Sequence, residues 1–109
     1  SVGMMAQTSL RGTVVDEAGN TPIVGAKVTL ANQNISTTTN GAGEFALLYL
    51  EPMDEEIIVE ADGYIATIEL GLLQENQNLK MEPIRLQRDF ARDAQEEILL
   101  NIADGFFGK

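Results

Sequence analysis

Short stretches in which apolar and polar residues alternate follow one another between residues 7 and 87, separated by clusters of turn-forming residues. A period of two places alternate side chains on the same face of a β-strand. The stretches cover residues 10–15, 26–31, 36–39, 44–50, 57–62, 64–70 and 79–86. Seven strands with no helix among them predict an all-β fold, a seven-strand Greek-key β-sandwich.

The individual strands differ in how their apolar residues are distributed. In 10–15 and 26–31 one face is apolar, with Leu10 and Val14 in the first and Val28 and Leu30 in the second. Stretch 44–50 is apolar on both faces, with Phe45, Leu47 and Tyr49 on one and Ala46, Leu48 and Leu50 on the other. Such a strand is covered on both sides or borders a partner surface.

Turn chemistry sets the expected boundaries. Residues 16–22, 40–43 and 52–55 combine carboxylates, Asn, Gly and Pro, and Asp62-Gly63 is typical of a hairpin. Pro83 cannot donate a ladder hydrogen bond, so we expect a bulge or an edge there. The polar, β-branched run Ser36, Thr37, Thr38 and Thr39 predicts a short edge strand.

The two ends of the chain have a different character. Residues 1–6 are small or apolar and uncharged, typical either of a signal-peptide remnant cleaved after Ala6 or of a disordered terminus. After Gln87, Asp89 can cap a helix with Phe90, Ala94, Ile98 and Ile102 at every fourth position, and Asp104-Gly105 can end it. We therefore expect three parts: 1–6, a sandwich over 7–87, and a helical tail over 88–109 that docks on the sandwich or links to a further domain.

Composition excludes several kinds of function. The 109 residues contain neither Cys nor His, which removes a disulfide framework, a thiol nucleophile, a zinc–thiolate site and the commonest general base. The net charge of −10 has the wrong sign for binding nucleic acid or anionic lipid. No apolar run approaches the roughly 20 residues of a membrane-spanning helix.

The remaining candidates for chemistry are weak. The acidic clusters Asp16-Glu17 and 54–56 lie in predicted turns, and adjacent strand residues point to opposite faces, so neither supplies a carboxylate pair for glycoside hydrolysis. Loop 16–20 offers three candidate oxygens for calcium but lacks the usual acidic spacing. Phe45, Tyr49 and Tyr64 are expected to pack in the core rather than form a sugar-binding platform. We predict no enzyme activity, cofactor or metal.

Four motifs occur in the order found in one family. The first consists of residues 12–16 together with 22–28, and the other three are 39–45, 59–64 and 81–86. Together they resemble carboxypeptidase regulatory-like domains, which have a prealbumin-like (transthyretin-type) sandwich and are accessory modules. The resemblance covers about seven tenths of the chain. In this comparison Gly43 turns the chain so that Phe45 enters the core, and Gly63 places Tyr64 where its hydroxyl can bond to backbone as a corner tyrosine does.

Two relatives of the fold lack their key residues here. The hydroxyisourate hydrolases of the transthyretin family depend on histidines, which this chain does not have. Adhesin modules that form a Lys–Asn isopeptide bond use a lysine where this chain has Val14 and Val15. The resemblance instead implies the N-terminal extension of a TonB-dependent outer-membrane receptor, ahead of its plug and barrel.

The sequence thus predicts a non-catalytic protein-interaction domain, monomeric in isolation, exported to the periplasm or outer membrane of a Gram-negative bacterium. Its partner would be a protein or a neighbouring domain of the same polypeptide. The alternatives are a small carbohydrate- or calcium-binding module and a passive spacer. The predicted contact residues are Ser36, Thr37, Thr38 and Thr39 on the edge strand and Ile98, Ile102, Phe106 and Phe107 in the tail.

Overall fold

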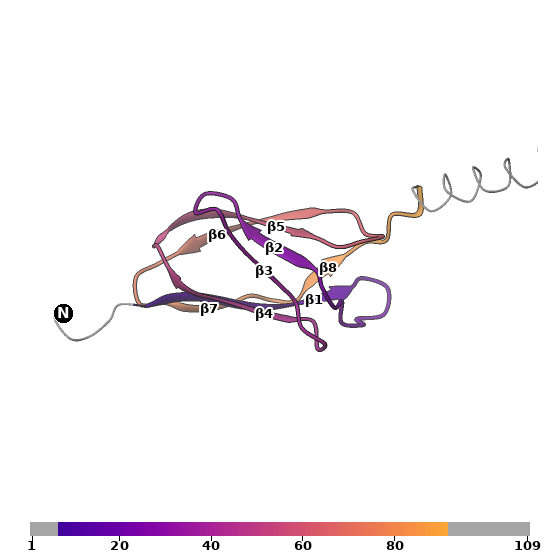
Figure 1. Ribbon diagram of the computed structural model, residues 1–109, viewed down its shortest axis with the longest axis horizontal. Coiled ribbons are helices and arrows are strands. Elements are labelled where there is room, and N and C mark those ends of the chain that lie inside the picture. The colour runs from indigo at the N-terminus through magenta and orange to yellow at the C-terminus, as the bar shows by residue number, and fades with distance from the viewer. Residues whose placement is uncertain (1–6, 92–109) are drawn as a thin grey trace, which may run out of the picture.

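The computed structural model describes residues 7–91, which form a sandwich of two β-sheets (Figure 1). Its strands are β1 (Thr8–Asp16), β2 (Lys27–Leu30), β3 (Ile35–Thr38), β4 (Glu44–Leu50), β5 (Met53–Glu60), β6 (Thr67–Leu73), β7 (Asn78–Lys80) and β8 (Ile84–Leu86). The predicted all-β sandwich is confirmed.

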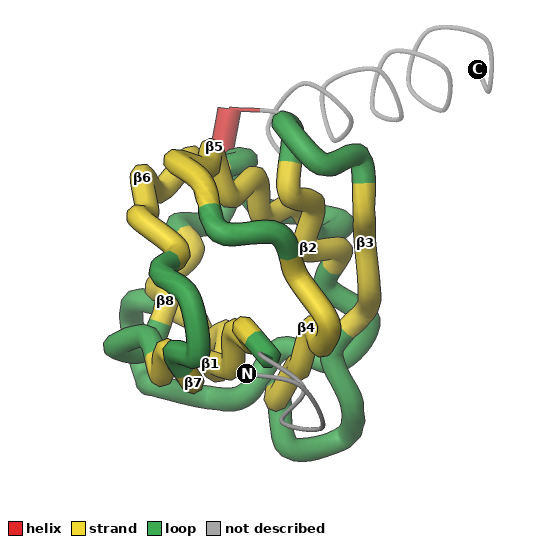
Figure 2. Tube along the Cα trace, turned by 90° about the vertical axis from the view of Figure 1, so that its left-hand side faces the viewer, coloured by secondary structure: helices red, strands yellow, loops and turns green. Residues whose placement is uncertain are grey.

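The two sheets have different pairing. In the first, β1 lies between β4, which is antiparallel to it, and β7 and β8, which are parallel to it. The second is fully antiparallel in the order β3-β2-β5-β6. Figure 2 looks along the sandwich and shows β3 and β6 on opposite sides of the second sheet. These two strands are therefore its edges.

The core lies between the sheets and consists of the apolar side chains that the alternation placed on one face. Leu10 and Val14 from β1 meet Val28 and Leu30 from β2, all fully buried. Other buried members of this cluster are Ile23, Ala26, Phe45, Leu47, Leu50, Ile57, Val59, Leu73, Ile84 and Leu86. Burial of these apolar side chains between the two sheets is the main force that holds the sandwich together.

Gly43 is the glycine that the fold requires most strictly. It has φ of +73°, and a Cβ there would lie 2.7 Å from the carbonyl oxygen of Val14. Its own carbonyl accepts a 2.8 Å hydrogen bond from the Val14 N–H, so the turn lies directly against β1. The next strand then begins with Phe45 facing the core, as predicted.

The last predicted strand is divided in two, which raises the strand count from seven to eight. Arg11 pairs with Lys80 and Val14 pairs with Ile84. The segment that pairs with β1 therefore has one residue more than β1 over this interval. The interruption contains Pro83, which lacks an N–H. The irregularity predicted at Pro83 is confirmed.

Two strand boundaries were predicted wrongly. β5 begins at Met53, so most of the predicted turn 52–55 is strand, and β6 covers Thr67–Leu73 rather than 64–70. Tyr64 forms an isolated bridge with Arg88, and the Ile65 N–H donates to the Gln87 carbonyl at 2.8 Å. Because residues 63–65 pair with this later segment, β6 starts only afterwards.

A β-bulge changes the facing of β4. Leu10 pairs with Leu47 but Thr8 pairs with Leu50, so β4 takes an extra residue. Tyr49 occupies the bulge with φ of +57° and is 71% exposed, whereas Leu50 turns into the core. The prediction that Tyr49 shares a buried face with Phe45 and Leu47 is therefore wrong, because the bulge reverses the alternation.

The predicted leader over 1–6 lies outside the described residues, as does the predicted helical tail beyond Ala91. Within residues 7–91 no helix has the length and apolar character needed to cross a membrane.

Candidate functional site

Asp16, Tyr64 and Arg88 lie together at one end of the sandwich, and the pKa values of Asp16 and Tyr64 are shifted there. Tyr64 donates a hydrogen bond from its hydroxyl to Oδ2 of Asp16 at 2.7 Å, joining the turn before β6 to the end of β1. The Ala18 N–H donates to Oδ1 of Asp16 at 2.8 Å. Arg88 places its guanidinium carbon 5.8 Å from the centre of the Tyr64 ring, a cation–π distance. The prediction that Tyr64 would bond to backbone is wrong, because the pairing of 63–65 with 87–89 brings its hydroxyl to a carboxylate.

These contacts move the two pKa values in opposite directions. The hydrogen bond from Tyr64, followed by that from the Ala18 N–H, lowers the pKa of Asp16 below its usual 3.8, and the charge of Arg88 acts in the same direction. The hydrogen bond to Asp16 raises the pKa of Tyr64 above 10.0, with burial adding to the effect. At neutral pH the pair is therefore an ionised carboxylate and a protonated phenol.

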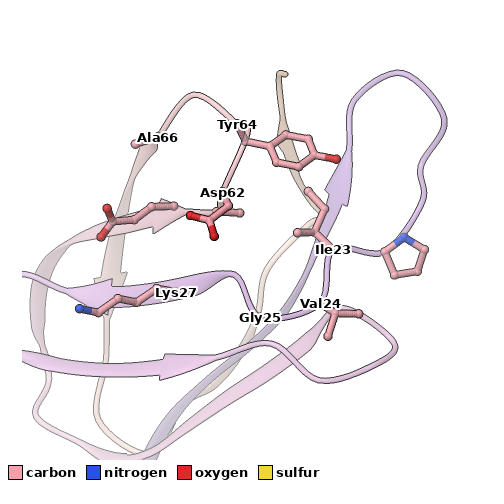
Figure 3. Close-up of a pocket in the computed structure, with 10 residues that line it drawn as sticks. Ile23, Val24, Gly25, Lys27, Asp62, Tyr64 and Ala66 are labelled. Carbon is pink, nitrogen blue, oxygen red and sulfur yellow. The ribbon is translucent and has the colours of Figure 1, made fainter. Parts of the chain in front are cut away.

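A cavity of about 740 Å³, lined in part by Tyr64, opens at this end of the sandwich (Figure 3). Asp62 and Tyr64 reach it from one segment, and Lys27 from the neighbouring strand β2. Lys27 is directly opposite Glu60 in the β2–β5 register, so the cavity wall carries one basic and one acidic side chain at facing positions. The rest of the lining comprises Pro22, Ile23, Val24, Gly25, Ala61 and Ala66.

Tyr64 is poorly suited to act as a nucleophile in this cavity at neutral pH. A phenol with a raised pKa is a poor base and nucleophile, and the hydroxyl of Tyr64 already donates to Asp16. Histidine and cysteine are absent from the sequence. The described lining residues supply hydrogen-bonding and charged groups, among them the amine of Lys27 and the carboxylates of Glu60 and Asp62.

The second acidic cluster stabilises a turn. Glu55 is only 2% exposed, and its carboxylate accepts hydrogen bonds from the N–H groups of Asn32 and Gln33 at 2.9 and 3.0 Å. The side-chain amide of Gln33 in turn donates to the Glu51 carbonyl and accepts from the Glu51 N–H. Glu55 therefore attaches the β2–β3 turn to β5, and Gln33 attaches the same turn to the β4–β5 turn.

Three side-chain oxygens of the loop considered for calcium accept hydrogen bonds from the protein. Both carboxylate oxygens of Asp16 accept hydrogen bonds, and Oδ1 of Asn20 accepts one from the Arg85 guanidinium. Among residues 7–91, no group of three or more acidic, His or Cys side chains is placed to hold a metal ion.

The predicted contact residues fall into three groups. Ser36, Thr37 and Thr38 lie on β3, an edge strand as expected. Thr39 is buried, and its hydroxyl donates to the Ile23 carbonyl at 2.6 Å and accepts from the Ala26 N–H at 2.9 Å, so it supports the fold. Ile98, Ile102, Phe106 and Phe107 lie outside the described residues.

The sequence reasoning missed a second exposed row. Ile68, Leu70 and Leu72 are 60%, 80% and 54% exposed on the edge strand β6. Their alternation with Thr67, Glu69 and Gly71 was visible, but the pattern alone does not say which face is outward. The register decides this, because β5 places Ile57 and Val59 in the core opposite Glu69 and Thr67.

Comparisons with known proteins agree with this architecture. The family model described as "Carboxypeptidase regulatory-like domain" matches residues 9–87. No curated protein matches the chain.

Similar solved structures show the fold alone. Hydroxyquinol 1,2-dioxygenase from Pseudomonas putida has a TM-score of 0.61 at 9% identity, and the match covers 82% of this chain and 59% of that one. The group B streptococcus pilus 2b backbone protein has a TM-score of 0.59 at 9% identity, covering 79% of this chain and 43% of that one. This chain thus spans about half the length of these structures.

Proposed function

Because the chain belongs to the carboxypeptidase regulatory-like domain family, a family of non-catalytic β-sandwich modules, we propose that it is an accessory interaction domain of an exported bacterial cell-envelope protein. In this proposal it is the N-terminal extension of a TonB-dependent nutrient receptor, lies in the periplasm or at the outer membrane, and contacts a protein partner or its own plug and barrel.

The observation that carries the proposal is how the polar groups are used. Asp16 and Tyr64 bond to each other, and Glu55 and Thr39 bond to backbone groups of neighbouring turns. These four polar side chains are therefore occupied in holding the strands and turns together. The second sheet in contrast ends in two strands, β3 and β6, whose outer edges have no strand partner among the described residues. Edge strands offer backbone groups to another chain, so contact through an edge is the activity that this geometry supports best.

The proposal is tested by the reading frame that encodes the chain and by fractionation of the cells that express it. We expect a plug-and-barrel sequence downstream and the protein in the envelope fraction. A cytosolic location, or a downstream region without a plug and barrel, would contradict the receptor setting. The predicted tail contacts at Ile98, Ile102, Phe106 and Phe107 remain a separate prediction, which deletion of residues 88–109 tests by partner capture.

A further inference from the structure

The outer face of β6 carries an apolar row that the fold does not use. Ile68, Leu70 and Leu72 project from alternate positions, and Leu70 is 80% exposed. Single apolar residues scattered over a surface are ordinary, but three exposed apolar side chains at alternate positions of one strand, all on the same face, are not. The side chain of Ile58, directly opposite Ile68 on β5, extends this row.

The strand that carries the row is also an open edge. β6 ends the second sheet, contains 7 residues and includes neither Pro nor Lys. Proteins usually protect an edge of this length with such residues or by covering it. The described residues supply none of these protections to β6 apart from Glu69, so its backbone is available for a further strand.

Acidic groups lie next to the apolar row. In the β5–β6 register Asp54 is opposite Leu72, and Glu56 is opposite Leu70. These residues line a hollow of about 440 Å³ together with Gly71. The surface therefore combines apolar contact area with negative charge, in a chain whose net charge is −10.

We propose that β6 is a docking edge for an extended protein segment in which apolar residues alternate with Lys or Arg. Added as a strand, the segment would place its apolar side chains beside Ile68, Leu70 and Leu72 and its basic side chains on the other face, beside Glu69. Asp54 and Glu56 lie on the apolar face, one strand further in, and act on the basic residues only through their longer-range charge. Cross-strand pairs of these two kinds are favourable, and backbone hydrogen bonds supply the rest of the affinity.

Charge decides between this occupant and a second copy of the chain. Pairing β6 with itself would also align apolar rows, but it would bring two acidic edges and two charges of −10 together. A basic segment gains from the same charges. This inference rests on the proposed function only because both require a protein partner. The inference adds which edge binds the partner and what chemistry the partner has.

The test uses the full chain and a short synthetic peptide of alternating valine and lysine at physiological salt, where long-range attraction is screened. Amide chemical-shift changes should be confined to β5 and β6, and β6 amides should gain protection from hydrogen exchange. Leu70→Ser should weaken binding by about tenfold, equivalent to about 1.4 kcal/mol. Leu48→Ser is the matched control, since Leu48 is an exposed leucine on β4 in the other sheet, and it should leave the affinity unchanged.

Three results would overturn the inference: equal affinity of the Leu70→Ser variant, shift changes centred on β3, or equal binding of a peptide of alternating valine and glutamate. A concentration-dependent dimer abolished by Leu70→Ser would identify a second copy as the occupant and would also refute it. Both variants change exposed side chains, and an unchanged thermal midpoint shows that each is folded. If the peptide does not bind but the protein is found in the envelope, this inference alone is refuted. The proposed function is tested separately, by cellular location and by the reading frame.

Discussion

The hydroxyl of Tyr64 lies 2.7 Å from Oδ2 of Asp16, although the two residues are separated by 48 positions in the sequence. The bond connects the last residue of β1 to the segment between β5 and β6, the two strands of the other sheet that flank it. A tyrosine and an aspartate at such a distance can suggest proton-transfer chemistry. Here the lowered pKa of Asp16 and the raised pKa of Tyr64 hold the proton on the phenol, and the pair acts as a structural link.

Tyr64→Phe removes this link while keeping the aromatic ring. We expect a lower urea midpoint and a rise in the pKa of Asp16 toward 3.8, because its strongest hydrogen-bond donor is lost. Carboxyl NMR titration measures the second effect. Tyr49→Phe serves as the control because that side chain is 71% exposed. An Asp16 pKa that does not change in Tyr64→Phe would refute the assigned role.

The same pair predicts how stability depends on pH. Asp16 has a lowered pKa in the fold, so its contribution is complete above pH 3.8 and is lost as the pH falls through the lowered value. Tyr64 has a raised pKa, so its contribution is complete below pH 10.0 and is lost as the pH rises through the raised value. The stability difference between wild type and Tyr64→Phe should therefore be largest between these limits. Urea unfolding across the pH range measures it, and a difference that grows in acid would have the wrong sign.

Glu55 should be the most costly acidic residue to remove. Glu55→Ala leaves the N–H groups of Asn32 and Gln33 without their acceptor in a part-buried turn, and we expect a loss of about 2 kcal/mol. Glu56→Ala, at the adjacent exposed position, should cost far less. Chemical denaturation compares them, and equal losses would show that burial of Glu55 has no stabilising consequence.

Tyr49 is strained in a way that a single substitution can reveal. The other non-glycine residues with positive φ in the described chain are asparagines, at positions 20, 34 and 76. Asparagine tolerates this conformation much better than tyrosine does. Tyr49→Asn should therefore raise the free energy of unfolding by about 1 kcal/mol. A loss of stability would mean that the Tyr49 ring makes a stabilising contact despite its exposure.

The sandwich could be predicted from the sequence because alternation within a strand and the residues of a turn are local features of the chain. Alternation in 10–15 and 26–31 identified the buried residues, and Gly43 and Pro83 marked a turn and an interruption that the structure contains. The errors have a common physical origin in long-range pairing. The bulge at Tyr49 depends on the register with β1, and the late start of β6 depends on the bridge between Tyr64 and Arg88.

The candidate site was harder to predict than the fold. Asp16 and Tyr64 belong to distant motifs, and no periodicity in the chain indicates that their side chains meet. The exposed row on β6 was visible as a pattern, but an apolar row is by default assigned to a core. Only the pairing of β6 with β5 shows that Ile68, Leu70 and Leu72 face outward.

The most direct test asks which surface touches another protein in the cell envelope. A photo-reactive side chain is placed in the full-length protein at Leu70 on β6, at Thr37 on β3, or at Val24, which is 65% exposed beside the cavity. A defined protein adduct should form at Leu70, with none from Val24, because contact occurs through a free strand edge. If adducts form from Val24 and none form from Leu70 or Thr37, the claim that this domain contacts its partner through its sheet edges is contradicted.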